Sequence, residues 1–266
     1  MTTLSTLKKF KKEGTKFTCL TCYDAMFARM MQQAEIDTIL IGDSLGMVVQ
    51  GHDSTLPVTV NDMAYHTANI ARSNQHALIL ADLPFMSYAT LPEAIANSRQ
   101  LMQAGAHVIK IEGGSELCEL VRILAQAGTP TCVHLGLTPQ SVNVFGGYKI
   151  QGRSDAAAQK LLDDAKAVVA AGAALIVLEC VPADLAKAVT EAVDAPVIGI
   201  GAGADTDGQV LVMHDMLGMV HGRVPRFIHD FLSDERNTDR SIEGAFALYH
   251  QSVRDGSFPQ AQHQFD

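Results

Sequence analysis

Tryptophan, cysteine and positive charge are scarce in this 266-residue chain. It has no Trp, and its five cysteines are an odd number. Four of them lie within or beside apolar runs, where a free thiol behaves as a small hydrophobe, so we do not expect disulfides. Lys and Arg number 20 against 29 Asp and Glu, which gives a formal net charge of -9. That charge disfavours nucleic acids and anionic membranes as partners.

Long apolar runs are also missing. Lysines occur at four of the first twelve positions, but no apolar stretch of the length of a secretory signal follows them. Nothing elsewhere reaches the length of a membrane span. We therefore expect a cytoplasmic protein. Hydrophobic residues make up 47% of the chain, and no polar linker divides it. Because one barrel of alternating strands and helices typically needs about 250 residues, residues 1–266 are expected to form one domain.

Five short apolar runs each end on a polar, ionisable residue. Runs rich in Val, Ile and Leu and separated by helical patterns are typical of buried parallel strands, whose carboxyl ends all point the same way. The five end residues should therefore converge on one face. The runs cover residues 38–43, 78–82, 108–112, 131–134 and 175–179, and they end at Asp43, Asp82, Glu112, His134 and Glu179.

Strands and helices are expected to alternate along the chain. Further strands are predicted at 17–21 and 197–200; the eighth is least clear, around 210–213, where Asp207 could instead cap a helix. This alternation favours an α/β fold of the (β/α)8 TIM barrel type, with an open doubly wound sheet as the alternative. Residues 225–266 are expected to add helices outside the barrel. Helices are predicted at residues 25–34, 60–72, 91–104, 115–127, 155–171 and 183–193.

Two glycine-bearing loops are longer than plain connections require. Residues 42–59 follow the second predicted strand and residues 136–154 follow the fifth. Long loops on the catalytic face of a barrel commonly contact substrate. Both loops are therefore assigned to the rim of the expected site.

Three of the strand-end acids suit a hard divalent cation. Asp43, Asp82 and Glu112 offer only oxygen ligands, which Mg²⁺ prefers, and three carboxylates at one place repel one another unless a cation or a proton joins them. Glu112 could instead lie outside the metal's direct ligands. A single carboxylate at a strand end is more often a helix cap or an ion-pair partner. Ser44 follows Asp43 and could bond a substrate oxygen, or begin a turn.

Lys110 lies two residues before Glu112 in the same predicted strand, so both side chains share a face. An interior lysine is costly unless an anion neutralises it. It could pair with Glu112 or bind a substrate carboxylate. A cation and a lysine together describe a pocket for a small anionic α-keto acid.

Glu179 and His134 complete the predicted site. Glu179 is either a further ligand or a general base that abstracts a proton beside a polarised carbonyl; structurally, it could cap the helix near residue 183. His134 could orient a substrate or a ligand, although a histidine at a strand end is commonly packed and hydrogen-bonded without further function.

Several motifs in order resemble the ketopantoate hydroxymethyltransferase family. The resemblance runs from about residue 17 to residue 231 and fades in the carboxyl-terminal tail. At position 22 the chain has Cys where Ala is expected, a small change that leaves the assignment intact. The motifs are IGDSLGM (41–47), GHDSTLPVT (51–59), ADLPF (81–85), KIEGG (110–114), HLGLTPQS (134–141), LECVP (178–182) and IGIGAG (198–203).

The resemblance implies a (β/α)8 barrel, Mg²⁺ and a homo-oligomer, specifically a homodecamer. It implies transfer of a one-carbon unit from 5,10-methylenetetrahydrofolate to 3-methyl-2-oxobutanoate, giving 2-dehydropantoate on the route to pantothenate. Asp43, Asp82 and Glu112 then match the metal positions. Ser44 and Lys110 match the ketoacid contacts, and Glu179 matches the proton acceptor.

Two alternatives remain at this point. One is a metal-dependent carbon–carbon lyase of the isocitrate lyase and phosphoenolpyruvate mutase type, which commonly carries a Lys-Lys-Cys-Gly-His loop. The comparable place here reads GGSELC (113–118), which counts against it. The other is a non-catalytic barrel kept as a binding subunit, which is expected to have lost some strand-end acids. All of them are present.

Overall fold

Eight parallel strands form a closed barrel in which each strand pairs with the next along the chain and the last pairs with the first. The computed structural model describes residues 1–220, 222 and 224–266. The barrel confirms the predicted (β/α)8 TIM fold and excludes the open sheet. The strands are β1 (Phe17–Thr21), β2 (Thr38–Ile41), β3 (Leu78–Asp82), β4 (Val108–Glu112), β5 (Thr131–Gly136), β6 (Leu175–Glu179), β7 (Val197–Ile200) and β8 (Gly208–Leu211).

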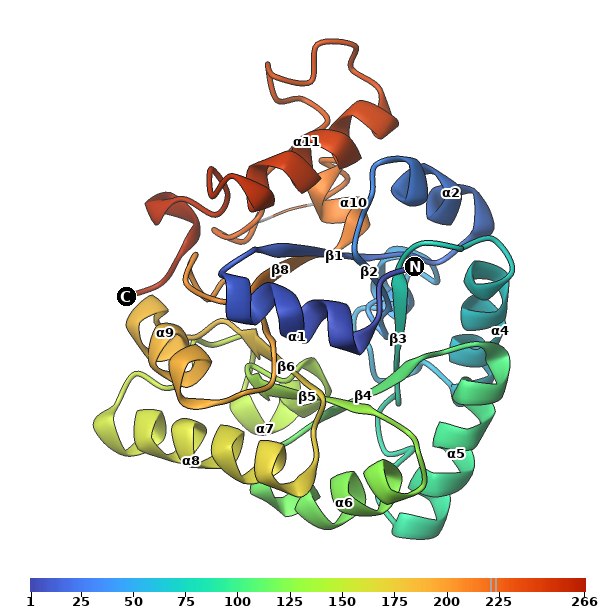
Figure 1. Cartoon of the computed structure of the whole chain (residues 1–266), viewed down its shortest axis with the longest axis vertical. Helices are drawn as coiled ribbons and strands as arrows, with labels where there is room; N and C mark the ends of the chain where they lie inside the picture. Colours follow the sequence, from blue (N-terminus) through green and yellow to red (C-terminus); the bar gives the residue numbers. More distant parts are fainter. Residues whose placement is uncertain (221, 223) are drawn as a thin grey trace.

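Helices surround the barrel and connect its strands (Figure 1). Short 3-10 turns lie at Ser115–Leu117 (η1), Pro139–Ser141 (η2) and Ala261–His263 (η3). The α-helices are α1 (Leu4–Glu13), α2 (Ala25–Gln33), α3 (Leu45–Val48), α4 (Val60–Ala71), α5 (Leu91–Ala104), α6 (Cys118–Gln126), α7 (Val142–Phe145), α8 (Asp155–Ala171), α9 (Ala183–Ala192), α10 (Met213–Met216) and α11 (Ile242–Arg254).

Capping residues set where several helices begin. The Asp24 carboxylate accepts hydrogen bonds from the backbone N–H groups of Met26 and Phe27 at the start of α2, and Thr59 and Asp62 form a capping box at the start of α4. These bonds satisfy backbone donors that have no partner within the helix. The predicted helices α5 and α8 have the expected bounds, and the other predicted helices end within two residues of them or, for α6, begin with a 3-10 turn.

The apolar core has two parts. Outward-facing strand residues pack against the helices, whereas inward-facing residues fill the barrel, including Leu80 of β3, Val108 of β4 and Val177 of β6. Leu7 of α1 is fully buried against this inner cluster, and α1 crosses one end of the barrel (Figure 1). The interior is therefore packed, and it leaves room for chemistry at the other end of the strands.

The eighth strand differs from its predicted position. It covers Gly208–Leu211 and not residues 210–213, because Met213 already belongs to α10. Asp207 does not cap a helix there. Its carboxylate instead accepts hydrogen bonds from Lys11 and from the backbone N–H of Val197, which ties α1 and β7 to the start of β8.

The carboxyl-terminal segment contains one long helix. α11 packs against α2 and β1 on the outside of the barrel. The Tyr249 hydroxyl donates hydrogen bonds to the carbonyls of Cys19 and Gln209 in β1 and β8. Phe227 and Phe231 belong to the segment expected to add helices, but they precede α11 and lie outside it. Among the described residues, no helix has both the length and the apolar character needed to cross a membrane.

Candidate active site

The predicted strand-end residues meet inside the barrel at the carboxyl ends of the strands. Strand pairing sets Asp82 of β3 beside Lys110 of β4, and Glu112 of β4 beside His134 of β5. Alternate residues of a strand share a face, so Lys110 and Glu112 both point inward, above the apolar layer formed by Val108. Glu179 ends β6 one strand further along.

A buried lysine joins the acids. The Lys110 ammonium lies 2.8 Å from Asp82 Oδ1 and 3.8 Å from Glu112 Oε1, and its side chain is 5% exposed. Asp82 Oδ2 accepts a hydrogen bond of 3.1 Å from the backbone N–H of Asp43. The first three acids of the predicted site therefore form one connected cluster with Lys110 at its side.

His134 connects the cluster to Glu179. Its Nδ1 lies 3.3 Å from Glu112 Oε1, and its Nε2 lies 3.3 Å from Glu179 Oε2. The ring is buried between the two carboxylates. This arrangement gives His134 an orienting position between two acids, which is the first of the two roles considered from the sequence.

Burial and mutual repulsion raise the pKa of two acids. The pKa of Asp43 lies well above its ordinary value because the carboxyl is buried and because Asp82 and Glu112 carry like charge beside it. The pKa of Asp82 is also raised, chiefly by burial, although Lys110 opposes this effect. The cluster therefore has too little positive charge for all its carboxylates to be ionised at low cost.

The basic groups respond in the opposite direction. Burial acts to lower the pKa of Lys110, but Asp82, Glu112 and Asp43 together raise it above its ordinary value. Burial and Lys110 likewise act to lower the pKa of His134, but Glu112 and Glu179 raise it to about 9. Burial would raise the pKa of Glu112, but His134 and Lys110 keep it below its ordinary value. Both basic side chains are thus held in the charged form.

Ser44 lies at the edge of the cluster, directly after Asp43. Its hydroxyl is 2.9 Å from the hydroxyl of Tyr23, a buried residue that follows β1. If Ser44 donates its proton to a substrate oxygen, Tyr23 must donate to Ser44. Tyr23 is therefore a residue with a place at the site that the sequence analysis did not assign, although it lies only two residues after the first predicted strand.

Gln140 is a second residue that the sequence analysis missed. Its side-chain Nε2 donates to Asp43 Oδ2 at 2.8 Å, and its backbone N–H donates to Glu112 Oε2 at 3.0 Å. The Tyr88 hydroxyl donates to Gln140 Oε1 at 2.6 Å. Gln140 lies within the HLGLTPQS motif after β5, so its position in a rim loop next to His134 was the available signal.

The acids suit a divalent cation that keeps other ligands. Asp82 Oδ1 and Glu112 Oε1 are buried and accept no hydrogen bond of good geometry, despite the nearby ammonium and imidazole. Within the described residues, no three His, Cys, Asp or Glu side chains stand close enough to enclose a cation alone. Mg²⁺ is commonly held by one or two carboxylates with water and substrate, so this donor set fits it.

Exposure differs among the carboxylates of the cluster. The Glu179 side chain is 16% exposed, whereas those of Asp82 and Glu112 are 2% exposed. The pKa of Tyr148, in the loop after α7, is raised by burial and by the charges of Glu179, Asp43 and Glu112. Glu179 is thus more accessible than Asp82 and Glu112.

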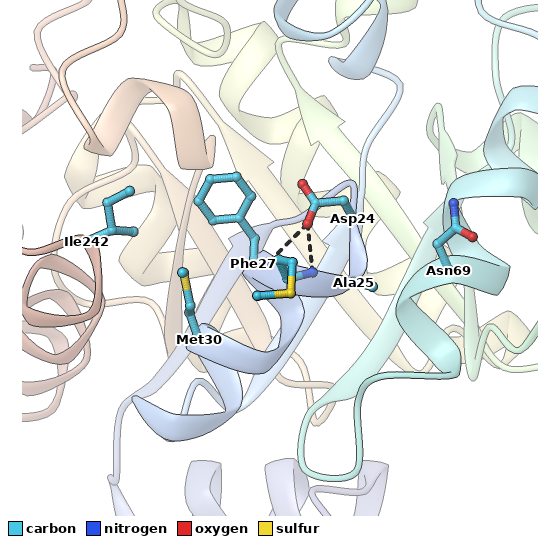
Figure 2. A pocket seen from close by; sticks show the side chains of 7 residues that line it. Asp24, Ala25, Phe27, Met30, Asn69 and Ile242 are labelled. Atoms are coloured by element: carbon cyan, nitrogen blue, oxygen red, sulfur yellow. Dashed lines mark hydrogen bonds between the residues drawn. The ribbon is translucent and has the colours of Figure 1, made fainter.

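Two surface cavities lie near the barrel, one away from the acid cluster and one that borders it at Glu112. One of about 470 Å³ is lined by residues of α2 and α4 and by Ile242 of α11, and Figure 2 shows Asp24 in it, bonded to the start of α2. It contains none of the predicted site residues. A second, of about 450 Å³, is lined in part by Tyr88, Glu112 and Gln140, but not by Lys110 or Glu179. The second cavity thus reaches one acid of the cluster, and neither cavity holds the whole predicted site.

Comparisons with known proteins agree with the motifs. A curated 3-methyl-2-oxobutanoate hydroxymethyltransferase from Psychrobacter arcticus is 87% identical over 265 residues, and the alignment covers 100% of both chains. One from Acinetobacter baylyi is 60% identical and covers 100% of this chain and 98% of its own. A solved structure of phosphonopyruvate hydrolase with oxalate and Mg²⁺ has a TM-score of 0.62 at 14% identity, and covers 99% of this chain and 93% of its own.

The structural likeness supports the barrel fold alone, whereas the sequence likeness is decisive for the family. The family profile described as ketopantoate hydroxymethyltransferase matches residues 1–261. With the whole-length relatives, this match selects hydroxymethyl transfer over the lyase and over the non-catalytic barrel. The chain belongs to the ketopantoate hydroxymethyltransferase family.

Proposed function

We propose that this hydroxymethyltransferase takes its one-carbon unit from 5,10-methylenetetrahydrofolate and transfers it to 3-methyl-2-oxobutanoate, with Mg²⁺ bound at the acid cluster and Glu179 as the base. The observation that carries the proposal is the contact chain from Asp43 through Asp82 and Lys110 to Glu112, His134 and Glu179. It brings two buried carboxylates suited to a cation and a more exposed carboxylate to the same face of one barrel.

Asp43 and Asp82 would hold the cation directly, and Glu112 would complete or support the site. The raised pKa values of Asp43 and Asp82 support this assignment, as does Asp82 Oδ1, which accepts no hydrogen bond of good geometry. When bound, Mg²⁺ would withdraw electron density from the keto and carboxylate oxygens of the substrate and so acidify the adjacent C–H bond. The oxalate and Mg²⁺ complex of phosphonopyruvate hydrolase is consistent with such a site in this fold.

Lys110 and Ser44 would bind the substrate. The Lys110 ammonium stays charged in the buried cluster, so it can neutralise a carboxylate that enters without water. The Ser44 hydroxyl, with Tyr23 behind it, can donate to a second substrate oxygen. Two donors at fixed positions would orient the oxoacid with its reactive carbon toward Glu179.

Glu179 would remove the proton from the carbon beside the ketone. It is the most exposed of the four site carboxylates, which suits a group that must reach a substrate atom. His134, 3.3 Å from Glu179 Oε2, would hold the carboxylate in place. His134 is therefore proposed as a residue that orients the base.

The transfer balances when water takes part. The substrate carbon loses its hydrogen and forms a bond to the one-carbon unit, the bonds from that unit to the folate nitrogens break, and water supplies the oxygen of the new hydroxymethyl group. The two freed folate nitrogens take up two protons, one equivalent to the proton removed from the substrate carbon and one from the water. The product is 2-dehydropantoate (ketopantoate).

The base assignment is tested by exchange in D₂O. The enzyme with Mg²⁺ and 3-methyl-2-oxobutanoate, without folate, should incorporate deuterium at the carbon beside the ketone. Glu179→Gln keeps the size of the side chain but removes its basicity, so exchange should fall by about 100-fold or more, the usual size of a general-base effect. Exchange followed by NMR at the wild-type rate in this variant would show that another group is the base.

The donor is tested separately. With 5,10-methylenetetrahydrofolate labelled with ¹³C at the methylene carbon, mass spectrometry should find the label in the hydroxymethyl group of the product. A product that forms without the labelled carbon would reject the folate donor and leave the base assignment untouched.

The remaining proposals concern the setting of the enzyme. We expect a cytoplasmic homodecamer that acts on small molecules and binds neither nucleic acid nor membranes, in keeping with the net charge of -9. Light scattering should give a particle mass ten times that of the 28.5-kDa chain. A monomer or dimer at micromolar concentration would reject the decamer. The division into a barrel and a helical extension at 225–266 stays a prediction.

A further inference from the structure

We propose that Gln140 and Tyr88 form a positioning pair that holds Asp43 and Glu112 at the separation needed to bind Mg²⁺. The inference rests on the proposed metal site and adds two residues to it, neither of which is itself a metal ligand. It arises from a buried residue that contacts two of the three acids in the cluster, one through its side chain and one through its backbone.

Gln140 touches the two acids with different groups. Its side-chain Nε2 donates to Asp43 Oδ2 at 2.8 Å, and its backbone N–H donates to Glu112 Oε2 at 3.0 Å. These acids come from the loop after β2 and from the end of β4. A single residue after β5 therefore ties together two carboxylates from separate parts of the barrel.

The surroundings fix the direction of the amide. Nε2 also donates to the Leu83 carbonyl at 3.0 Å, so both of its protons face oxygen acceptors. Turning the amide by 180° would bring Oε1 against the Asp43 carboxylate and the Leu83 carbonyl, which repel it. Gln140 is 6% exposed, so water cannot easily replace a lost bond.

Tyr88 holds the other end of the amide. Its hydroxyl donates to Gln140 Oε1 at 2.6 Å and also lies 3.2 Å from the Glu112 carbonyl. The backbone N–H of Glu112 donates to the same hydroxyl at 3.3 Å. Tyr88 thus contacts the backbone of Glu112 and orients the side chain of Gln140, which bonds Asp43. Its hydroxyl makes no contact with the carboxylates themselves among the described bonds.

This geometry leaves the carboxylates free to bind a cation. Gln140 occupies one oxygen of Asp43 and one of Glu112, while Glu112 Oε1 keeps no hydrogen bond of good geometry. A bonded carboxylate keeps its orientation when the cation leaves, so the protein need not order it again on binding. Outer partners of this kind commonly contribute 10- to 100-fold to metal affinity.

The test is a calorimetric titration of the full-length enzyme with MgCl₂. Gln140→Met keeps the side-chain length and removes the side-chain donor to Asp43 and the acceptor for Tyr88, while the backbone N–H that bonds Glu112 remains. The Mg²⁺ dissociation constant should rise by about 10- to 100-fold. Tyr88→Phe removes only the outer hydroxyl and should raise it by roughly fivefold. In both variants, excess Mg²⁺ should recover part of the lost kcat/KM for the oxoacid.

Tyr249→Phe is the matched control. It also removes a buried tyrosine hydroxyl that donates to backbone carbonyls, but Tyr249 lies on α11 outside the barrel. This variant should lower the melting temperature and leave the Mg²⁺ dissociation constant within about twofold of the wild type, because no cluster residue is its partner. Loss of Mg²⁺ affinity here as large as in Tyr88→Phe would mean that general destabilisation explains both, which would overturn the proposal.

The double variant tests whether the two residues act as one unit. If Tyr88 acts through Gln140, Tyr88→Phe should weaken Mg²⁺ binding no further once Gln140 is Met. Fully additive losses would contradict the pairing. Wild-type affinity in Gln140→Met would overturn the inference while leaving the metal site intact. Absence of Mg²⁺ binding by the wild-type enzyme would instead reject the proposed metal site, and the inference with it.

Discussion

At the scale of single residues, Asp215 shows how a neighbouring charge changes a carboxyl group. Asp215 lies in α10, after β8, and burial together with the negative charge of Glu179 raises its pKa to about 6. The ordinary value for an unfolded chain is about 3.9. The folded protein therefore binds this proton more tightly than the unfolded chain does.

The raised pKa of Asp215 makes the folded protein less stable at higher pH. Ionised Asp215 disfavours the folded state, so stability is lost as the pH rises from about 4 through 6. Asp215→Asn should be more stable than the wild type at about pH 8, by on the order of 1 kcal/mol after screening, and the two should converge at about pH 4.5. Urea unfolding at both pH values measures this. A variant less stable than the wild type at the higher pH would contradict the stated cause.

Some residues of the site can be predicted from the sequence, and others cannot. Asp82, Glu112 and Glu179 were predictable because parallel strands bring their carboxyl ends to one face, whatever the loops do. Gln140 and Tyr88 were not, because their contacts depend on how two loops fold over the strand ends. Local sequence contains no period or cap that signals such a contact.

At the scale of elements, the end of β5 controls the position of Glu179. Gly136 has a positive φ of 90°, and a Cβ added there would lie 2.3 Å from the Glu179 carbonyl oxygen. That carbonyl accepts a hydrogen bond from the backbone N–H of Leu137 at 2.8 Å. The strand end therefore requires glycine both for its backbone conformation and for its contact with β6.

Gly136→Ala should destabilise the fold and displace the base. We expect a loss of about 3 kcal/mol in the free energy of unfolding, together with deuterium exchange at least about tenfold slower. Gly128→Ala is the control: its φ is also positive, at 81°, but no atom lies within 4 Å of the added Cβ. It should cost only about 1–2 kcal/mol and leave exchange unchanged. Equal effects from the two substitutions would rule out the contact with Glu179 as the cause.

Element boundaries were predictable where local chemistry marks them. Asp24 and Thr59 cap α2 and α4, and Gly105 and Gly172 end α5 and α8 in the left-handed conformation that glycine favours. α1 was not predicted, because its lysine-rich sequence gives little apolar pattern. Its place is determined by Leu7, which packs into the barrel end, a long-range contact that local sequence cannot show.

At the scale of the whole molecule, Arg254 links three distant segments. The α11 guanidinium lies 2.6 Å from Asp37 Oδ1 and 4.7 Å from the ring of Phe10 in α1. Asp37, just before β2, also accepts hydrogen bonds from the backbone and hydroxyl of Thr18 in β1. These contacts attach α11 to α1 and to the part of the barrel formed by β1 and β2.

Arg254→Met should weaken this attachment without touching the chemistry. Removing one partner of a partly buried ion pair leaves Asp37 with only its bonds from Thr18, so the free energy of unfolding should fall by about 1–2 kcal/mol. Deuterium exchange by the folded enzyme should stay at the wild-type rate, because Arg254 has no contact with the acid cluster among the described residues. Unchanged stability in denaturant titrations would show that the pair contributes nothing.

The whole barrel is needed to bring the acids together, since Asp43, Asp82 and Glu112 are separated by about thirty or more residues along the chain. The most direct test of this account is a calorimetric Mg²⁺ titration of the wild type beside Asp43→Asn and Asp82→Asn, with circular dichroism to show that the variants are folded. The account predicts one ion per chain, and at least about tenfold weaker binding in each variant. Folded variants that bind Mg²⁺ as tightly as the wild type would contradict it.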